Sequence, residues 1–498
     1  MKGILVSTVL LFSLALGSLI CTAVSLQSDV CDVHLAEITH QGDIGAAAGL
    51  TVVSKNHWRN HAVWTTTHAL GHPAAAETDF DFSAWRIYAK SDYDPTYIEI
   101  DSDPSRGFDF TDAIEKFGMP LGEIEAQNFD VTNAYGSFRE VATDPSLGLA
   151  AAYNELYMEA EPGVEAKKIV HLSDYYDYYP INIHIHLPGV IWTNNDVSPT
   201  TVAEPGTEAY VVQAFRDYFK IPMLDEVLEI HMTRTSNHGF SWGSSTVEGV
   251  GFYFYALSAA DSKNCYFTFN TETDKGEQDM QIDISEIKGG YGIYRLPYRR
   301  GTSTEDIGID VDSMEMVYPL KPGTQIEGLY FNAAETRLLL VTKADDTTVQ
   351  IDVIDPVSYD CLQTFKVGGA FFRHLKIYED YTVAVTHDKL MVLTESEGTY
   401  THAFTTACTT DAEGEPIAVT SAHVTAFDGT RLAVANNTRA EKYSGIDMCG
   451  YDVTVYSADG ILWDGTVTNT LDTGLRKNTY SQDDIAPLYG EQLALSWE

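Results

Sequence analysis

One unit recurs three times between Thr324 and Val467, and this repeat constrains the fold more than any other feature of the sequence. Each copy contains short runs rich in Val, Leu, Ile, Thr and Tyr, and turn residues such as Asp428-Gly429 and Asp459-Gly460 separate these runs. β-branched and aromatic residues fit a pleated surface, and an Asp-Gly pair between two such runs is a strong hairpin signal. The repeat therefore predicts short antiparallel strands joined by tight turns.

The spacing of the copies indicates how these strands are grouped. The second run of each copy starts near Arg337, Tyr381 and Arg431, so the starts are 44 and 50 residues apart. Four short strands in every ~40 to 50 residues form one blade of a β-propeller. At ~45 to 65 residues for each blade with its insertions, the chain predicts an all-β fold. We expect a single β-propeller of about seven four-stranded blades, with six and eight as alternatives.

The three copies also resemble the degenerate blades of WD40-like and YVTN-like propellers. The segment from Val455 to Trp463 is similar to the hairpin between the third and fourth strands of those blades. The Gly-His and Trp-Asp pairs of true WD repeats do not recur here, and Trp463-Asp464 stands alone. The resemblance implies a scaffold. Propellers host binding proteins, lyases, lactonases and dehydrogenases alike, so it implies no single function.

The first 25 residues predict export of the chain. Met1-Lys2 precedes an apolar run with no charge until Asp29, as in a signal peptide or a membrane anchor. Small residues before Leu26 favour cleavage, whereas the length of the run favours an anchor, because ~20 apolar residues span a bilayer. Both alternatives predict an extracytoplasmic protein, secreted or membrane-anchored. Residues 26–498 would form the propeller domain, and only the N-terminal segment would touch a membrane.

The charge balance limits the partners that we expect. The chain has 31 basic and 72 acidic residues, which gives a net charge of −41. Phosphate backbones repel such a surface, so nucleic acid is not an expected partner. Acidic surfaces favour solubility, association with cations and contact with basic partners.

The strand pattern is interrupted at about residues 206–230, where we expect a helix-containing insertion. The segment Glu208–Phe219 places Val211, Phe215 and Tyr218 at helical spacing on one apolar face. At the other end of the chain, Gln492–Trp497 predicts a strand. We expect it to pair with a strand near His34–Thr39, which would close the ring and cover its open edges.

Two groups of histidines have spacings that a metal site could use. The first group contains two pairs, each four residues apart: His57, His61, His68 and His72. On a helix each pair would share a face. The residues between His61 and His68 predict a strand, however, where positions four apart are separated by ~13 Å. We therefore expect no metal role for this group. His184 and His186 share one strand face, which we interpret as a polar face rather than a metal site.

The segment Asp101–Asp112 resembles a calcium loop. Oxygen donors fall at positions 1, 3, 5, 9 and 12, and calcium prefers such hard ligands. The candidate ligands are Asp101, Asp103, Asp109 and Asp112. Glycine stands at position seven instead of six, and Asp replaces Glu at position twelve. We therefore favour an acidic surface loop over a calcium site, and calcium is the one candidate cofactor.

Two aromatic segments are candidate binding surfaces, because flat rings bury contact area at a low entropic cost. The first contains four tyrosines between acidic residues, and the second is a polar and aromatic segment. Their candidate residues are Tyr175, Tyr176, Tyr178 and Tyr179 in the first, and His231, His238 and Trp242 in the second. The alternative for the tyrosines is a strand edge whose alternate rings belong to the core.

The sequence contains no catalytic motif that we recognise: GxSxG, P-loop and dinucleotide-binding patterns do not occur. We therefore expect a binding module for protein or glycan partners. One alternative is an extracellular propeller hydrolase or lyase acting on a polysaccharide or other polymer. A second alternative is a structural subunit of an envelope complex.

Overall fold

The computed structural model describes the chain from residue 32 to residue 498, apart from a set of internal gaps. The segments outside the description are 1–31, 59–61, 82–87, 93–96, 102–151, 154, 157–158, 175–181, 187–189, 195–199, 204–207, 212–226, 235–239, 249–255, 271, 276–277, 282–286, 300–307, 310–312, 370, 411–413, 418, 421–422, 440–447, 473–484 and 488–492. The predicted signal peptide or anchor thus lies outside the described residues. Within them, no helix has the length and apolar character needed to cross a membrane.

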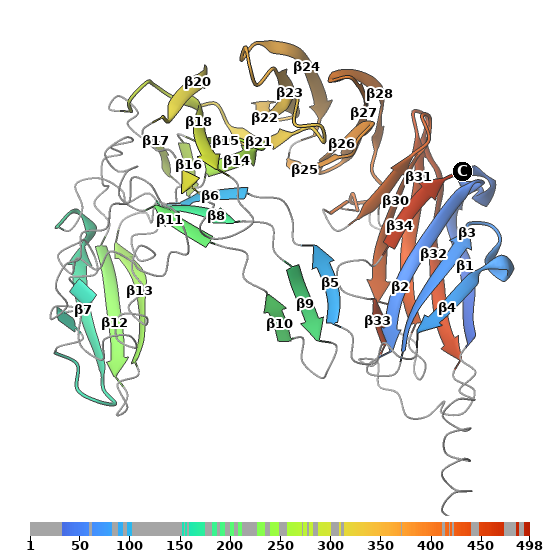
Figure 1. The fold of residues 1–498 in the computed structure, drawn as a ribbon, viewed down its shortest axis with the longest axis horizontal. Helices are drawn as coiled ribbons and strands as arrows, with labels where there is room; N and C mark the ends of the chain where they lie inside the picture. Colours follow the sequence, from blue (N-terminus) through green and yellow to red (C-terminus); the bar gives the residue numbers. More distant parts are fainter. Residues whose placement is uncertain are drawn as a thin grey trace, which may run out of the picture. The chain divides into compact units, whose positions relative to one another are not determined.

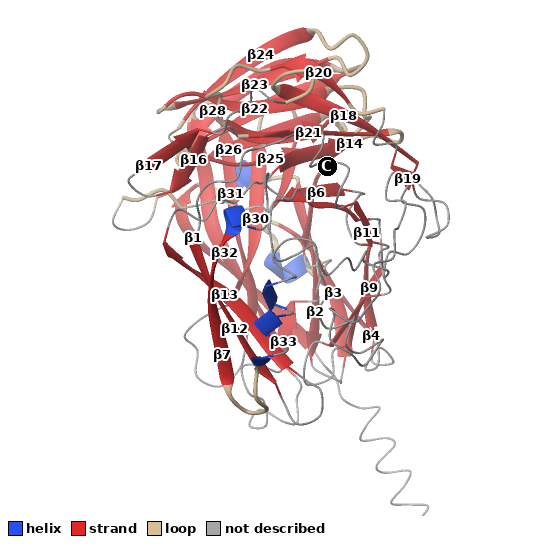
Figure 2. Ribbon diagram, turned by 90° about the vertical axis from the view of Figure 1, so that its left-hand side faces the viewer, coloured by secondary structure: helices blue, strands red, loops and turns tan. Residues whose placement is uncertain are grey.

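The chain divides into two compact units, which we describe separately (Figure 1). Unit 1 comprises Met1–Ser91, Ile191–Val202 and Ala403–Glu498, and unit 2 comprises Asp92–Val190 and Ala203–His402. Strands dominate both, as the colouring of Figure 2 shows. Three short 3-10 segments are described: η1 (Ile44–Ala47), η3 (Pro73–Ala75) and η6 (Leu172–Asp174). Ala152, Tyr153, Glu155, Leu156 and Glu159 are also helical. The predicted all-β class is confirmed.

The threefold repeat folds into three four-stranded antiparallel meanders, as its turn pattern predicts. Their strands are β21 (Ile326–Phe331), β22 (Leu338–Asp345), β23 (Thr348–Ile354) and β24 (Cys361–Gly368) in the first copy; β25 (Phe372–Ile377), β26 (Tyr381–Thr386), β27 (Lys389–Ser396) and β28 (Thr399–Ala407) in the second; and β29 (Val424–Phe427), β30 (Leu432–Arg439), β31 (Met448–Ser457) and β32 (Gly460–Asp472) in the third. The hairpin predicted at Val455–Trp463 is the β31–β32 turn, where Ser457 pairs with Gly460. Gly460 has a φ of 115°, a conformation that favours glycine.

Other sheets precede the repeat in the sequence. One contains β14 (Ala256–Ala260), β15 (Asn264–Phe269), β18 (Gly292–Arg299) and β20 (Glu315–Pro319), with β19 (Gly308–Ile309) also paired to β18. The three-stranded sheets are β13 (Phe240–Glu248), β12 (Val227–Arg234) and β7 (Glu165–His171); β11 (Glu208–Val211), β8 (Asn182–His186) and β6 (Tyr97–Asp101); and β10 (Thr200–Ala203), β9 (Val190–Asn194) and β5 (Tyr88–Asp92). A two-stranded ribbon joins β16 (Glu272–Lys275) to β17 (Gln278–Gln281).

The helix expected over Glu208–Phe219 is wrong at its start, because Glu208–Val211 forms strand β11. This strand pairs with β8, so that Ala209 and Val211 lie opposite Ile185 and Ile183. Strand preference depends on neighbours across the sheet, and a partner rich in Ile outweighs the helical spacing of a short segment. The rest of the expected helix lies outside the described residues.

The two ends of the chain close unit 1 by exchanging strands. The N-terminal strand β1 (Asp32–Gly42) pairs antiparallel with β32, the last strand of the third copy. The C-terminal strands β33 (Ile485–Pro487) and β34 (Leu493–Trp497) pair with β2 (Leu50–Trp58). That sheet continues through β3 (Ala62–Ala69) to β4 (Glu77–Asp81). Each end of the chain therefore completes a sheet whose other strands come from near the opposite end.

The expected pairing of Gln492–Trp497 with His34–Thr39 is consequently wrong: β34 pairs with β2, and β1 pairs with β32. The physical reason is burial. Alternate residues of β34, including Leu493, Leu495 and Trp497, pack against the core of unit 1, and only the edge beside β2 brings them there. Strand β1 thus takes the outer position beside β32, and β34 takes the outer position beside β2.

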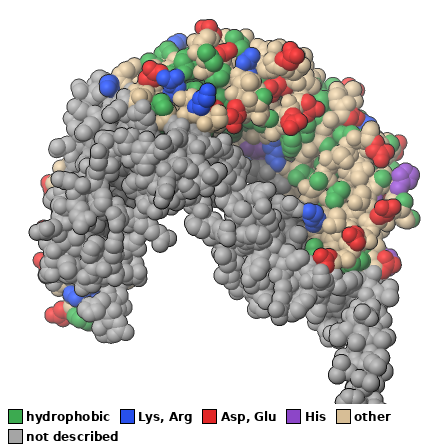
Figure 3. All heavy atoms as spheres, viewed as in Figure 1, with side chains coloured by type: hydrophobic (Ala, Val, Ile, Leu, Met, Phe, Trp, Pro, Cys, Tyr) green, Lys and Arg blue, Asp and Glu red, His purple; other side chains and the backbone are tan. Residues whose placement is uncertain are grey.

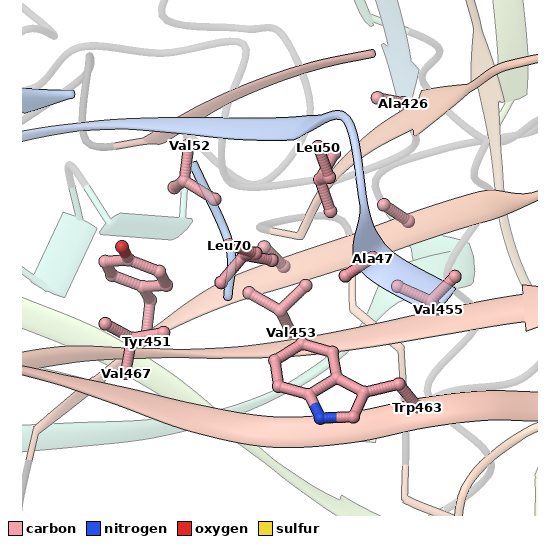
Figure 4. Close-up of a cluster of buried hydrophobic side chains, with 12 residues drawn as sticks. Ala47, Leu50, Val52, Leu70, Ala426, Tyr451, Val453, Val455, Trp463 and Val467 are labelled. Carbon is pink, nitrogen blue, oxygen red and sulfur yellow. The ribbon is translucent and has the colours of Figure 1, made fainter. Parts of the chain in front are cut away.

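The core of unit 1 lies between these two sheets (Figure 4). Leu50, Val52 and Leu70 come from the N-terminal sheet, and Val453 and Trp463 come from the sheet of the third copy. Burying each such side chain contributes about 1.5–3 kcal/mol, so this cluster holds the exchanged strands together. A separate cluster around Val341, Ile351 and Leu393 packs the first two copies of the repeat in unit 2.

Candidate functional site

A group of polar side chains lies on the face of the β1-β32-β31 sheet that is opposite the core. We call it the Asp452 cluster, and its members are His40, Asp452, Thr454, Asp464 and Thr466. Successive residues of a strand point to opposite faces. Val453 and Trp463 belong to the core, so the residues beside them in the sequence take the other face. The alternation of β31 and β32 thus produces the cluster.

Short hydrogen bonds connect the members of the Asp452 cluster. The Thr466 hydroxyl donates to Asp452 Oδ1 at 2.5 Å, and the Thr454 hydroxyl donates to Asp464 Oδ1 at 2.7 Å. His40 Nε2 lies 2.8 Å from Thr466 Oγ1. Because the Thr466 hydrogen is used for Asp452, His40 is the donor in this contact. His40 is also the extra residue of a β-bulge between Thr39 and Gln41, and bulges re-aim side chains.

The environment of Asp452 makes its carboxyl group harder to ionise. Burial raises the pKa of Asp452, and the negative charge of Asp464 raises it further. The hydrogen bond from Thr466 and the charge of His40 act in the opposite direction, and the net direction is upward. Tuned carboxyl groups of this kind occur at binding and acid–base sites, and they also occur in structural networks.

The first copy of the repeat contains an Asp–Thr pair similar to Asp452–Thr466, and the comparison shows which parts of the Asp452 cluster are shared between copies. Asp352 on β23 lies opposite Thr364 on β24, and the Thr364 hydroxyl donates to Asp352 Oδ1 at 2.6 Å. There the Gln350 amide donates to both oxygens of the carboxylate, which is buried. The Asp–Thr pair therefore recurs in the first and third copies of the repeat. The second carboxylate and the histidine are particular to the Asp452 cluster.

The chemistry of the cluster suits a neutral or basic ligand with hydroxyl or amide groups. Two carboxylates accept charge-assisted hydrogen bonds, and the hydroxyls and the imidazole add further donors and acceptors. Within the part of the chain that the structure describes, no group of three or more His, Cys, Asp or Glu is placed to hold a metal ion. Acidic side chains are also spread over the described surface in Figure 3, with Lys and Arg between them.

The core side of the same sheet contributes to a buried polar relay. Tyr451 Oη lies 3.0 Å from His68 Nδ1, and His68 Nε2 lies 2.8 Å from Glu37 Oε1. Glu37 Oε1 also accepts a hydrogen bond from the Gly71 amide at 2.8 Å. Burial lowers the pKa of His68 against the opposing effect of Glu37, and burial raises the pKa of Tyr451. His68 and Tyr451 are 1% and 2% exposed, so the relay joins three strands and is closed to a substrate.

Most of the site residues that the sequence predicts lie outside the described residues. Asp101 is the exception among the calcium-loop residues: it is described, and it ends β6 opposite Asn182. The others outside the description are Asp103, Asp109, Asp112, Tyr175, Tyr176, Tyr178, Tyr179 and His238. The calcium loop and the tyrosine surface therefore stay predictions.

The two described members of the second aromatic segment lie on opposite faces of the β12–β13 hairpin. His231 pairs with Gly243, whereas Trp242 pairs with Met232, and directly paired residues share a face. The Trp242 ring packs edge-on against Tyr153, with 5.1 Å between the ring centroids. His231 covers Gly243 so closely that a Cβ there would lie 2.7 Å from Nε2. The structure therefore does not bring His231 and Trp242 onto one contact surface.

The strand predicted between His61 and His68 is confirmed as β3. His68 faces the core and takes part in the relay, whereas His72 precedes η3 and is exposed. His57 lies opposite Val63 in the β2–β3 pair, and His61 is outside the described residues. His184 and His186 lie on β8, opposite Tyr210 and Glu208 of β11.

Sequence reasoning did not single out any member of the Asp452 cluster. A signal was present, because Asp452 and Thr454 alternate with apolar residues, as do Asp464 and Thr466 across the recognised hairpin. His40 carried no local signal. Its partner Thr466 is 426 residues away, and only the strand exchange brings the two together.

Comparisons with known proteins show no family for this chain. No protein-family profile and no curated protein matches the sequence. AztD from Citrobacter koseri is 9% identical and matches 63% of this chain and 72% of its own, with a TM-score of 0.25. A proposed 6-phosphogluconolactonase from Bacteroides fragilis is 10% identical and matches 90% and 97%, with a TM-score of 0.29. TolB from Acinetobacter baumannii is 9% identical and matches 70% and 85%, with a TM-score of 0.19. These structures are β-propellers of no single family, and nothing about ligand or activity follows from them.

Proposed function

We propose that the chain is an exported β-propeller of about seven blades that binds a protein or glycan partner, and that the Asp452 cluster is one of its contact sites. The observation that carries this proposal is the cluster itself. Two carboxylates, two hydroxyls and an exposed imidazole are fixed by short hydrogen bonds on a rigid sheet. Groups held in this way lose little entropy when a ligand with hydroxyl or amide groups binds.

Several features support the scaffold part of the proposal. Three consecutive four-stranded meanders have the strand order of propeller blades. The exchange of β1 and β34 ties the two ends of the chain, which is how a ring of blades would be closed. The apolar segment at residues 1–25 supports export. Sequencing the N-terminus of protein purified from its own cells distinguishes a cleaved signal, with Leu26 first, from an anchor.

A glycan array and a pull-down from the protein's own cell surface test the binding function. We expect Asp452→Asn and Thr466→Val to weaken binding of the captured partner at least about tenfold, which corresponds to about 1.4 kcal/mol. Asp459→Asn is the matched control, because it removes the same charge at the tip of the same hairpin, outside the cluster. Equal binding by all three variants and the parent would contradict a role for the cluster.

The second candidate function is hydrolysis of an extracellular polymer. The observation that favours it is the raised pKa of Asp452 beside a second carboxyl group, because a general acid and a base need different ionisation states. In that case Asp452→Asn and Asp464→Asn would abolish turnover and leave substrate affinity within about threefold. Activity would also fall as the pH rises above the raised pKa of Asp452, since the acid form would be lost.

A further inference from the structure

The core-facing side of the β2–β3 sheet changes from apolar to polar along its length. Val52 belongs to the core cluster, whereas the next alternate positions of β2 are Ser54 and Asn56. On the neighbouring strand, Thr66 lies opposite Ser54, and Trp64 lies opposite Asn56. All four side chains are buried. The interior of unit 1 is thus polar at this end.

The core-facing side of the β1-β32-β31 sheet, across the core, also changes from apolar to polar in this direction. Tyr451 pairs with Val467, and the next core-facing residue of β32 is Asn469. The contact of Tyr451 with His68 aligns the two sheets, because His68 is itself paired with Val52. In Figure 4, Tyr451, Val467 and Val52 lie at one end of the apolar cluster, away from Trp463. The level beyond this end holds Ser54 on one sheet and Asn469 on the other.

We call Ser54, Asn56, Trp64 and Asn469 the polar layer, and each of them is between 1% and 3% exposed. Within the described structure, five of their side-chain atoms have no hydrogen-bond partner: Ser54 Oγ, Asn56 Nδ2, Trp64 Nε1, Asn469 Nδ2 and Asn469 Oδ1. Buried polar groups in folded proteins are almost always hydrogen-bonded, and each exception costs its full desolvation penalty. Five exceptions on four residues would cost as much as the stability of a whole domain. A dry polar layer is therefore excluded.

The donor and acceptor character of the five atoms indicates which kind of molecule could hydrogen-bond to them. The three nitrogens donate, Asn469 Oδ1 accepts, and the Ser54 hydroxyl can do both. A cation would face the N–H groups, and an anion would lie near the carboxyl group of Glu37 in the adjoining relay. A neutral molecule with hydroxyl groups matches both kinds of atom. Water is the smallest such molecule, and buried waters typically make about three hydrogen bonds to groups of this kind.

We propose that ordered water molecules occupy the polar layer and bridge Asn469 on β32 to Ser54, Asn56 and Trp64 on β2 and β3. The bridge joins the sheet that β1 completes to the sheet that β34 completes. The closure of unit 1 accordingly has an apolar part, centred on Trp463, and a hydrated part beyond the Glu37–His68–Tyr451 relay.

Oxygen-17 magnetic relaxation dispersion on the full chain counts long-lived internal waters and tests this proposal. We expect fewer such waters, and a lower melting temperature, in both Asn469→Leu and Ser54→Ala. Thr66→Val is the matched control. Thr66 shares the same buried face, but its hydroxyl already contacts Thr78 Oγ1 at 3.2 Å, so its removal should leave the water count unchanged.

Unchanged water counts in Asn469→Leu and Ser54→Ala would overturn the proposal. A raised melting temperature in these variants would do the same, because a dry interior gains stability when it loses an unpaired polar atom. If Asn469→Leu does not fold, the water count and the melting temperature of Ser54→Ala, which is the smaller change, test the proposal. A small polyol is the other neutral hydroxyl ligand. If millimolar glycerol or glucose raises the melting temperature of the parent, and Asn469→Leu abolishes this shift, the occupant is a polyol and the water proposal is wrong.

Discussion

Single residues of the N-terminal strand act on both faces of the sheet that it joins. Glu37 points to the core side and contacts His68, whereas His40 contacts Thr466 on the opposite side. The close approach of β1 to β32 also requires glycine at position 42, where a Cβ would lie 2.0 Å from the Leu462 carbonyl oxygen. Strand β1 therefore couples the closure of the chain to the geometry of the Asp452 cluster.

The relay predicts that acid weakens unit 1. The pKa of His68 in the folded chain is lowered from 6.5 by burial, whereas the unfolded chain keeps the ordinary value. Above pH 6.5 both states are neutral at this residue. As the pH falls below 6.5 the unfolded state binds the proton first, so folding stability is lost by up to about 1.4 kcal/mol per pH unit until the folded-state pKa is reached.

Melting temperatures measured between pH 8 and pH 5 check this expectation. The parent should lose stability through this range more steeply than His68→Gln, in which the titrating group is absent. His34→Gln is the control, because it makes the same substitution at an exposed position of β1. Parallel curves for the parent and His68→Gln would show that His68 does not contribute.

At the scale of elements, two arginines occupy corresponding positions in the first and third copies. Each donates a hydrogen bond to a backbone carbonyl of another segment. Each immediately precedes the second strand of its copy. Arg337 Nε donates to the Gly398 carbonyl in the β27–β28 turn of the second copy, at 2.9 Å. Arg431 Nη1 donates to the Ala46 carbonyl of η1 at 2.7 Å, and its guanidinium lies 4.1 Å from the centre of the Trp497 ring. Each arginine thus ties its copy to another sheet.

Replacing Arg431 by Met should therefore destabilise the chain by about 2 kcal/mol, because a carbonyl partner, the ion pair with Asp428 and a cation–π contact are lost together. Arg337→Met should cost about 1–2 kcal/mol, because the bonds to the Gly398 and Thr336 carbonyls and the ion pair with Asp355 are lost. Urea denaturation measures both values. Arg373→Met is the control, since Arg373 is exposed and its loss should stay within about 0.5 kcal/mol. The same loss in all three variants would contradict the assigned links.

The elements that the sequence predicts well are those whose partners lie nearby in the chain. Asp459-Gly460 and its flanking strands specify the β31–β32 hairpin locally, and β3 follows from its run of β-branched residues. The partners of β1 and β34 depend on contacts across more than 400 residues, and no local pattern carries that information. The same limit applies to β11, where pairing with β8 overrides a helical spacing. The Asp452 cluster was missed for this reason, because His40 arrives from a strand that local pattern cannot assign.

At the scale of the whole molecule, the exchange of terminal strands joins segments from near the two ends of the sequence within unit 1. A meander of antiparallel units leaves one open edge at each end, and open edges recruit other chains. Here β1 covers the outer edge of the third copy, and β34 covers the edge of the β2–β3–β4 sheet. Strands β1 and β34 consequently pack partly buried side chains, among them Leu35 and Trp497, against the core of unit 1.

Removing residues 492–498 should therefore destabilise unit 1 as a whole. The deletion takes away Leu493, Leu495 and Trp497, which pack against the core cluster, and uncovers the edge of β2. We expect a loss on the order of 4 kcal/mol, because three partly buried apolar side chains contribute less than their full transfer energies. The midpoint of urea unfolding, followed by tryptophan fluorescence and far-UV circular dichroism, measures this loss.

Leu495→Ala should reproduce about half of it, whereas Ser496→Ala, which changes the exposed face of the same strand, should leave the midpoint unchanged. Equal midpoints for the truncated and the full chain would mean that β34 does not close the fold.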